Sequence, residues 1–110
     1  MPYINVSTSV KVEDKKKLLN EISILVSSLT NKSRRFVMAK LEDDSEMYFE
    51  DENPCCFLEI KSIGSLSPSE MANPISNFVH EKIGIPRDKI YISFEDVPVS
   101  MWAWNGKTFG

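Results

Sequence analysis

The feature that most constrains the fold of this chain is a weak internal repeat with an offset of 53 residues. Arg34 falls on Arg87 under this shift, and residues 41–43 fall on residues 94–96. Two apolar runs also correspond, residue by residue and in order. The first run is Leu18, Leu19, Ile22, Leu25 and Val26, and the second is Met71, Ala72, Ile75, Phe78 and Val79. Apolar residues at every third or fourth position are typical of a helix with one buried face. The repeat therefore predicts two tandem β-α-β units.

Strand-like segments flank both predicted helices. Residues 3–10 alternate and are rich in β-branched side chains, and we also predict strands over residues 36–41, 57–63 and 90–94. Residues 47–49 are a candidate for a further short strand. A crossover helix requires the two strands that it joins to be parallel, with a right-handed connection. The prediction is an α/β fold with a four-stranded sheet and two helices on one face. The other face must then be covered, or be the place where subunits meet.

Capping residues predict where the two helices begin and end. Acidic residues at positions 13 and 14 open the first helix, and Asn31 is expected to close it. Residues 67–70 (Ser-Pro-Ser-Glu) predict the start of the second helix, with the first serine as cap and the glutamate completing a capping box. Gly84 is expected to close this helix. Pro74 lies about two turns into it, so a kink or an early end is expected there.

Length, charge and composition exclude several classes of function. The 110 residues suit one domain, and 42% hydrophobic with 26% charged residues is ordinary for a globular protein. The net charge of −3 argues against nucleic acid as a partner, because nucleic-acid binding needs a basic face. No run of about 18 apolar residues predicts a membrane span, and the N-terminus has no signal-peptide features. We therefore expect a cytoplasmic protein with neither a nucleic-acid nor a membrane partner.

The cysteines and the single histidine offer little for metal or redox chemistry. Cys55 and Cys56 are adjacent, and neighbouring residues of a strand point to opposite faces, so a disulfide between them would be strained. His80 alone leaves little for a metal site or for a histidine-based catalytic triad. We expect His80 to lie on a helix surface or to have its hydrogen bonds satisfied within the protein, and we predict no metal site.

Pro2 is the first candidate for chemistry. Removal of Met1 would leave a secondary amine at the start of the chain, and an α-amino group titrates near about 7.7–8.0. An apolar pocket or a nearby lysine would lower that pKa, which suits a general base at neutral pH. While Met1 is attached, however, the Pro2 nitrogen is an amide and cannot be a base. Many chains also begin Met-Pro without a catalytic role. Taken singly, solvation or packing accounts for the other candidates, which are Lys32, Trp102, Trp104 and Phe109.

Taken together, short motifs along the chain carry a resemblance to a known family. Their order is Met1-Pro2 before the first strand, Asn31-Lys32 after the first helix, Pro54-Cys55 before the third strand, Ser62-Ile63-Gly64 at its end, Ile90-Tyr91-Ile92 in the next strand, and Trp104-Asn105 with Thr108-Phe109 in the tail. In this order and spacing the chain resembles the macrophage migration inhibitory factor family, including the dopachrome tautomerases, within the tautomerase superfamily. The resemblance runs almost from end to end.

The resemblance implies both an assembly and a reaction. It implies a homotrimer of β-α-β-β-α-β subunits, with the sheets facing inward around a central channel and the active sites between subunits. It also implies cofactor-free interconversion of the keto and enol forms of aromatic 2-oxo acids, such as phenylpyruvate and its hydroxyphenyl analogue. Pro2 would be the catalytic acid/base. Lys32 would bind the substrate carboxylate or keto oxygen, and its charge would keep Pro2 neutral.

The resemblance further implies four substrate-binding contacts. The backbone amide of Ile63 would bind the carboxylate, Tyr91 of the adjacent subunit would line the aromatic end of the pocket, and Trp104 and Phe109 would lie at its mouth. These roles are chemically coherent, because removing a proton beside a ketone needs a base and a donor for the enolate. An aromatic substrate also needs an apolar pocket.

Several positions depart from the family's pattern. Ser93 stands where asparagine is common, and Lys61 stands where a histidine often precedes Ser-Ile-Gly. Leu58 occupies the second position of a Cys-x-x-Cys segment found in some members, so thiol–disulfide exchange is not expected. Tyr3 and Trp102 are larger than the residues familiar at these pocket-adjacent positions, so they would narrow the site and change substrate preference.

Two other functions stay open at the level of sequence. One is a cytokine-like signalling protein on the same fold, secreted or released without a leader, whose tautomerase activity is vestigial or secondary. The other sets the resemblance aside, since tandem β-α-β units also build small regulatory domains that bind metabolites. That second alternative predicts a site at helix ends and no dependence on a free N-terminus.

Overall fold

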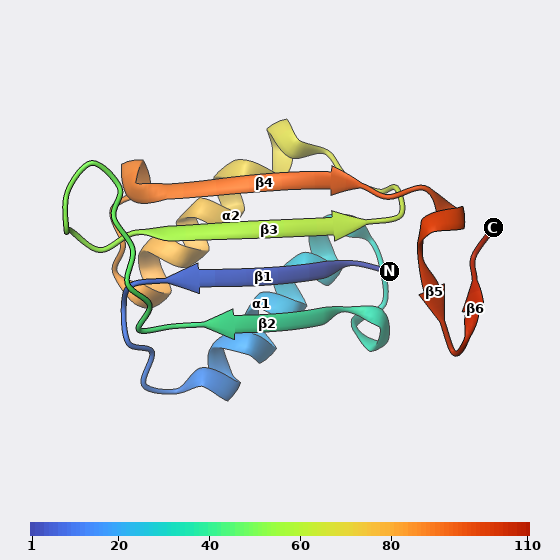
Figure 1. Cartoon of the computed structure of the whole chain (residues 1–110), viewed down its shortest axis with the longest axis horizontal. Coiled ribbons are helices and arrows are strands. Elements are labelled where there is room, and N and C mark those ends of the chain that lie inside the picture. Colours follow the sequence, from blue (N-terminus) through green and yellow to red (C-terminus); the bar gives the residue numbers. More distant parts are fainter.

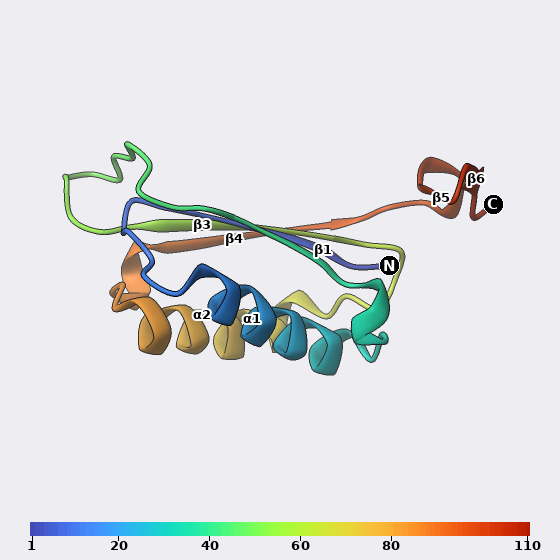
Figure 2. The same cartoon turned by 90° about the horizontal axis from the view of Figure 1, so that it is seen from below.

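Both helices pack on one face of a single four-stranded sheet (Figures 1 and 2). The computed structural model describes all residues, 1–110. The elements of the two units are, in chain order, β1 (Tyr3–Thr8), α1 (Lys15–Thr30), β2 (Met38–Glu42), β3 (Cys56–Ser62), α2 (Pro68–Ile83) and β4 (Ile90–Asp96). Short 3₁₀ turns follow α1, α2 and β4, and a small hairpin closes the chain: Arg34–Phe36, Arg87–Lys89 and Val99–Met101, then β5 (Ala103–Trp104) and β6 (Lys107–Thr108).

The repeat predicted from the sequence is confirmed in the structure. Shifting the bounds of α1 by 53 gives the bounds of α2, and the same shift maps the turn Arg34–Phe36 onto Arg87–Lys89. A side-chain contact repeats as well, because Arg34 donates to Asn20 and Arg87 donates to Asn73. In both units an arginine beyond the helix therefore ties the following turn back to the outer surface of that helix.

The sheet is mixed, with strand order β2-β1-β3-β4. Within each unit the strands are parallel, β1 with β2 and β3 with β4, as a crossover helix requires. The two units join through an antiparallel β1–β3 pairing, in which Ile4 lies opposite Ile60 and Val6 opposite Leu58. The predicted four-stranded sheet with two helices on one face is thus confirmed. Neither helix has the length and apolar character that a membrane crossing requires.

The core lies between the sheet and the helices. Alternate residues of β1 and β3 point toward the helices, and they meet the apolar stripes of α1 and α2. The buried cluster comprises Ile4, Val6, Ile22, Val26, Cys56, Leu58, Ile60, Met71, Ile75, Val79, Ile85 and Ile90. Figure 2 shows that the opposite face of the sheet carries no helix. That bare face is polar at its centre, where the side-chain amide of Asn5 donates to Glu42 and Glu59.

Several strand boundaries differ from the sequence prediction, and the third strand is Cys56–Ser62 rather than 57–63. The second strand begins at Met38 rather than at residue 36, because Ser33 accepts the Arg35 N–H and starts the 3₁₀ turn Arg34–Phe36. The first strand ends at Thr8, and the last strand runs on to Asp96. The alternating pattern predicted the wrong lengths for these strands, because a strand ends where its hydrogen bonding to the neighbouring strand ends.

The candidate strand over residues 47–49 is wrong. Phe49 makes only an isolated bridge to Asp51, and the backbone of Asp44 and Glu50 is in the left-handed region, with φ of 51° and 68°. Left-handed residues interrupt an extended strand. The connection between β2 and β3 is therefore an irregular loop, attached to the body by the Lys89 ammonium, which donates to the Phe49 carbonyl at 2.9 Å and to Asp51 at 3.2 Å.

The second helix begins and ends as predicted, but without the capping box. The Ser67 side chain makes no capping hydrogen bond; its carbonyl accepts the N–H of Glu70 at 2.9 Å instead. Pro74 does not end the helix, which continues to Ile83 before Gly84 closes it with φ of 72°. The predicted caps of α1 are confirmed, since Asp14 accepts the Lys17 N–H and Asn31 adopts the left-handed conformation.

Candidate active site

The start of β1 lies at one end of the sheet, beside the end of α1. Pro2 is fully buried there, and its carbonyl accepts the N–H of Met38 at 3.0 Å, which extends the β1–β2 pairing to the beginning of the chain. Because the backbone of Pro2 is held in the sheet, the nitrogen of this residue has a defined position rather than a fraying one.

Lys32 is held by the end of α1. Asn31 closes the helix with φ of 56°, and the N–H groups of Asn31 and Lys32 both bond to the carbonyl of Ser27, the second at 3.2 Å. The Ser27 hydroxyl in turn donates to the Lys32 carbonyl at 2.5 Å. No carboxylate lies within ion-pair distance of the Lys32 ammonium. The backbone of Lys32 is therefore held in place by hydrogen bonds, while its ammonium group forms no ion pair within the chain.

Ile63 leaves β3 in a tight turn. Gly64 follows with φ of 66°, a conformation in which a side chain would be strained, and its N–H donates to the Asp96 carboxylate at 2.9 Å. The N–H of Val97 binds the carbonyl of Ser62 at 2.9 Å. The N–H of Ile63 takes part in none of the hydrogen bonds outside the helices and strands, so it is a donor available to a ligand.

Two adjoining cavities surround the N-terminus. One, of about 310 Å³, is lined by Met1, Pro2, Tyr3, Arg35, Phe36, Val37, Met38, Trp102, Ala103 and Trp104. The other, of about 520 Å³, is lined by Met1, Asn31, Lys32, Ser33, Phe36, Ile63, Val99 and Phe109. Met1 and Phe36 line both cavities, so the two cavities adjoin at these residues. The structure thus brings five of the six predicted site residues to the same end of the sheet, and Tyr91 is the exception.

The surroundings of the N-terminus favour a neutral amine. Burial first, and the charge of Lys32 second, lower the pKa of the Met1 amine below its usual value. No aspartate or glutamate lines either cavity to oppose this effect. An amine whose pKa is lowered is neutral over a wider range below pH 8, and only the neutral form has a lone pair that accepts a proton.

Aromatic rings form the walls around the amine. Phe36 contacts Trp104 edge to face, with ring centroids 6.0 Å apart and ring planes at 84°. Tyr3 and Trp102, the two unusually large residues, line the Pro2 cavity as expected. Trp104 and Phe109 remain 53% and 40% exposed, so the apolar wall on the side of the tail is uncovered in the single chain.

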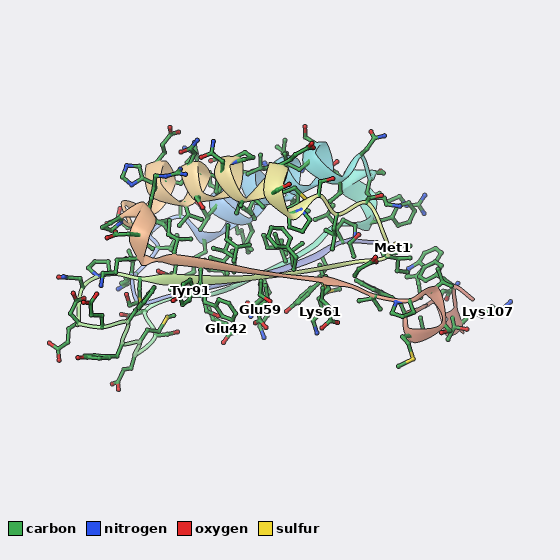
Figure 3. The ribbon with its side chains drawn as sticks, turned by 90° about the horizontal axis from the view of Figure 1, so that it is seen from above. Met1, Glu42, Glu59, Lys61, Tyr91 and Lys107 are labelled. Carbon is green, nitrogen blue, oxygen red and sulfur yellow. The ribbon has the colours of Figure 1, made fainter.

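Tyr91 does not join the other predicted site residues within one chain. Near the start of β4 it lies opposite Phe57, and its ring packs on Phe49 with centroids 4.5 Å apart. Figure 3 shows Tyr91 and Met1 at different ends of the sheet. Tyr91 is 61% exposed. Any contact of Tyr91 with the Pro2 site must therefore come from another subunit.

Sequence reasoning missed Arg35 and Phe36 as lining residues. Phe36 was assigned to a strand, where it would have been one more alternating apolar residue. The available signal was Ser33, whose side chain favours a turn start and so predicts a break before the strand. Cys56, by contrast, contributes nothing to the site, because burial, and then the neighbouring Cys55, raise the pKa of its thiol to about 12.

Comparison with known proteins identifies the family. The family model described as "Macrophage migration inhibitory factor (MIF)" matches residues 1–110. The chain belongs to the macrophage migration inhibitory factor family. A MIF homologue from Brugia malayi is 29% identical over 115 residues, with all of both chains covered. One from Trichinella spiralis is 28% identical over 114 residues, covering 99% of this chain and all of the homologue.

Solved structures of MIF homologues share the whole fold. The crystal structure of the homologue from Prochlorococcus marinus has a TM-score of 0.93 and 40% identity, and covers 98% of this chain and 99% of its own. The structure from Trichinella spiralis has a TM-score of 0.90 and 27% identity, with 97% and 99% covered. The predicted resemblance is thereby confirmed along the chain, including the segment that carries Pro2 and the segment that carries Lys32.

Proposed function

We propose that this MIF-family protein is a cofactor-free tautomerase of aromatic 2-oxo acids, with the amine of Pro2 as the acid/base once Met1 has been removed. The observation that carries the proposal is the position of the chain start. It lies beside an unpaired lysine, in cavities with aromatic walls and no acidic side chain. A base, a cation and an apolar wall are the parts that enolisation of such an acid needs.

Each part has an assigned role in the proposal. The neutral Pro2 nitrogen takes a proton from the carbon beside the keto group and delivers it to the enolate oxygen, which gives the enol. The reverse transfer, from the enol oxygen to that carbon, restores the keto form. Lys32 binds the carboxylate or the developing enolate oxygen, and the N–H of Ile63 binds the carboxylate. Trp104 and Phe109 pack against the ring of the substrate. Lys32 would act twice. Its charge, which would bind the anion, lowers the pKa of the Met1 amine in the unprocessed chain, and it would lower the pKa of the Pro2 amine in the same way once Met1 is removed.

Lys32→Ala tests the role of the cation. With protein whose N-terminus has been verified as Pro2, the variant should raise KM for phenylpyruvate about tenfold or more, because a charge-assisted hydrogen bond is lost. The pKa of the Pro2 amine should rise as well, so the ascending limb of the pH–rate profile should move to higher pH. Both quantities are measured by following enol formation across a range of pH.

Lys16→Ala is the matched control, since Lys16 is an exposed lysine in the first turn of the same helix, whereas Lys32 follows its last turn. It should leave KM and the pH profile unchanged. An unchanged KM with normal turnover in Lys32→Ala would remove Lys32 from the site. Absence of enolisation by the unsubstituted Pro2-terminal protein would overturn the proposed function itself.

We also propose that the active unit is a homotrimer with sites between subunits. Large apolar side chains support this, since they are exposed in the single chain on the bare sheet face and on the arm formed by residues 99–110. They are Met38 and Tyr91 on the face, and Val99, Met101, Trp104 and Phe109 on the arm. The arm extends past the end of the sheet (Figure 1), where it contacts little of its own core. A second subunit would bury both surfaces.

Sedimentation of the purified protein should therefore give the mass of a trimer rather than that of the 12.6 kDa chain.

Tyr91→Ala should lower kcat/KM for phenylpyruvate even though Tyr91 lies far from Pro2 within one chain. A stable monomer with full tautomerase activity would contradict the shared site.

A further inference from the structure

The cavity beside Pro2 contains a cation with no partner. Arg35 lines this cavity of about 310 Å³ together with Pro2 and Trp104, and no carboxylate lies within ion-pair distance of its guanidinium. The neighbouring Arg34 behaves differently, because its guanidinium donates to Asn20 on the outer surface of α1. Two adjacent arginines of one turn thus point to different surroundings, and only Arg35 belongs to the cavity.

Local structure holds Arg35 in this place. Its N–H donates to the Ser33 hydroxyl at 3.3 Å, at the start of the 3₁₀ turn Arg34–Phe36. Its guanidinium carbon lies 5.4 Å from the centroid of the Phe36 ring, within the range of a cation–π interaction. Phe36 in turn contacts Trp104 edge to face. The guanidinium therefore packs on an aromatic ring, while Arg35 is exposed and its side chain donates no hydrogen bond to another protein group.

Arg35 and Lys32 lie in separate compartments of one site. Lys32 lines the cavity of about 520 Å³ and Arg35 the cavity of about 310 Å³, while Phe36 and Met1 line both. Neither cavity has an acidic lining residue, although the chain has 16 aspartates and glutamates and a net charge of −3. Two cations without an acidic partner therefore line adjoining cavities of an acidic protein.

We propose that the preferred substrate carries two anionic groups, and that Arg35 binds the second. Lys32 takes the carboxylate next to the keto group, and Arg35 takes an acidic group at the far end of the molecule. This inference rests on the proposed function and specifies its substrate class as 2-oxo acids with an aromatic or planar body and a distal carboxylate. A planar guanidinium suits a carboxylate because it offers two parallel N–H donors.

Paired substrates test the inference. Phenylpyruvate and its 4-carboxy derivative undergo the same enolisation and differ by one distal carboxylate. Protein beginning at Pro2 should show a kcat/KM about tenfold higher for the 4-carboxy compound, and Arg35→Gln should abolish this preference through KM. The loss of kcat/KM in this variant should be at least about fivefold larger for the 4-carboxy compound than for phenylpyruvate. Arg35→Lys should retain part of the preference, because it keeps the charge and loses the paired donors.

Arg34→Gln is the matched control, and it should keep the full preference because Arg34 lines neither cavity. The inference is overturned if the unsubstituted protein shows no preference, if Arg35→Gln affects both substrates equally, or if Arg34→Gln has the same effect as Arg35→Gln.

A binding measurement separates this inference from the proposed function. Cinnamate and 4-carboxycinnamate have no keto group to enolise, and quenching of tryptophan fluorescence reports their binding because Trp102 and Trp104 line the Arg35 cavity. Suppose that 4-carboxycinnamate binds more tightly than cinnamate, that Arg35→Gln removes this difference, and that the protein enolises neither substrate. This result would uphold the anion-binding role of Arg35 and reject the tautomerase function. If the protein enolises phenylpyruvate but prefers the dianion in neither assay, the tautomerase function is upheld and the role of Arg35 is rejected.

Discussion

Protein that retains Met1 should enolise phenylpyruvate at least about 100-fold more slowly than protein that begins at Pro2. The Pro2 nitrogen is an amide while Met1 is attached, and an amide has no basic lone pair. The Met1 amine lies in the same surroundings, but it is placed one residue further out. Steady-state kinetics on the two forms, each verified by intact mass, measure the difference in rate. The Met1-retaining form should have a lower kcat and a higher KM.

Two controls distinguish loss of the base from blockage of the site. Met1 lines both cavities, so its side chain would also occupy space that the substrate needs. Acetylation of the Pro2-terminal protein restores an amide without that side chain, and it should reproduce most of the loss in kcat. Pro2→Gly keeps an N-terminal amine after processing and should retain partial activity. Equal rates for the Met1-retaining and Pro2-terminal forms would exclude Pro2 as the base.

Ile22→Ala should lower the free energy of unfolding by about 2–5 kcal/mol, because it removes buried methyl groups and leaves a cavity. Ile22 is 0% exposed and lies in the cluster between α1 and the sheet. Urea denaturation at one fixed protein concentration measures the loss, and the concentration must be held constant because assembly would stabilise the folded subunit.

Ile24→Ala is the matched control for this stability effect. Ile24 lies two residues along the same helix and is 45% exposed, so the substitution removes little buried surface. Alanine also has the higher helix propensity, which offsets part of any loss. The expected change is below about 1 kcal/mol. Similar losses for the two variants would contradict the assigned orientation of α1.

Most of the secondary structure could be predicted because its signals are local. The apolar stripe of α1, the cap at Asn31 and the stop at Gly84 each depend on residues within a few positions of one another. The tail carried such a signal too. Asn105-Gly106 is the dipeptide that favours a two-residue hairpin turn, and both residues have positive φ, 53° and 80°. The β5–β6 hairpin was therefore predictable, although the aperiodic pattern around it hid the short strands.

The candidate site was only partly predictable from residue patterns. Pro2 and Lys32 are ordinary residues when taken singly, and only their joint spacing with other motifs pointed to one family. Arg35 and Phe36 belong to no such motif. They became site residues because the turn that contains them packs beside the start of β1, where the Pro2 carbonyl accepts the Met38 N–H.

By itself the sequence determined the two repeated units and the helix ends, and it proposed Pro2 as a candidate acid/base. Only the tertiary structure decided that Pro2, Lys32 and Ile63 meet at one end of the sheet while Tyr91 lies away from them. The reason is physical. Periodicity records which side of an element is buried, but the antiparallel β1–β3 pairing joins residues far apart in the chain, such as Ile4 and Ile60, which are 56 positions apart. That pairing, together with the parallel pairings within each unit, sets which strand ends lie together.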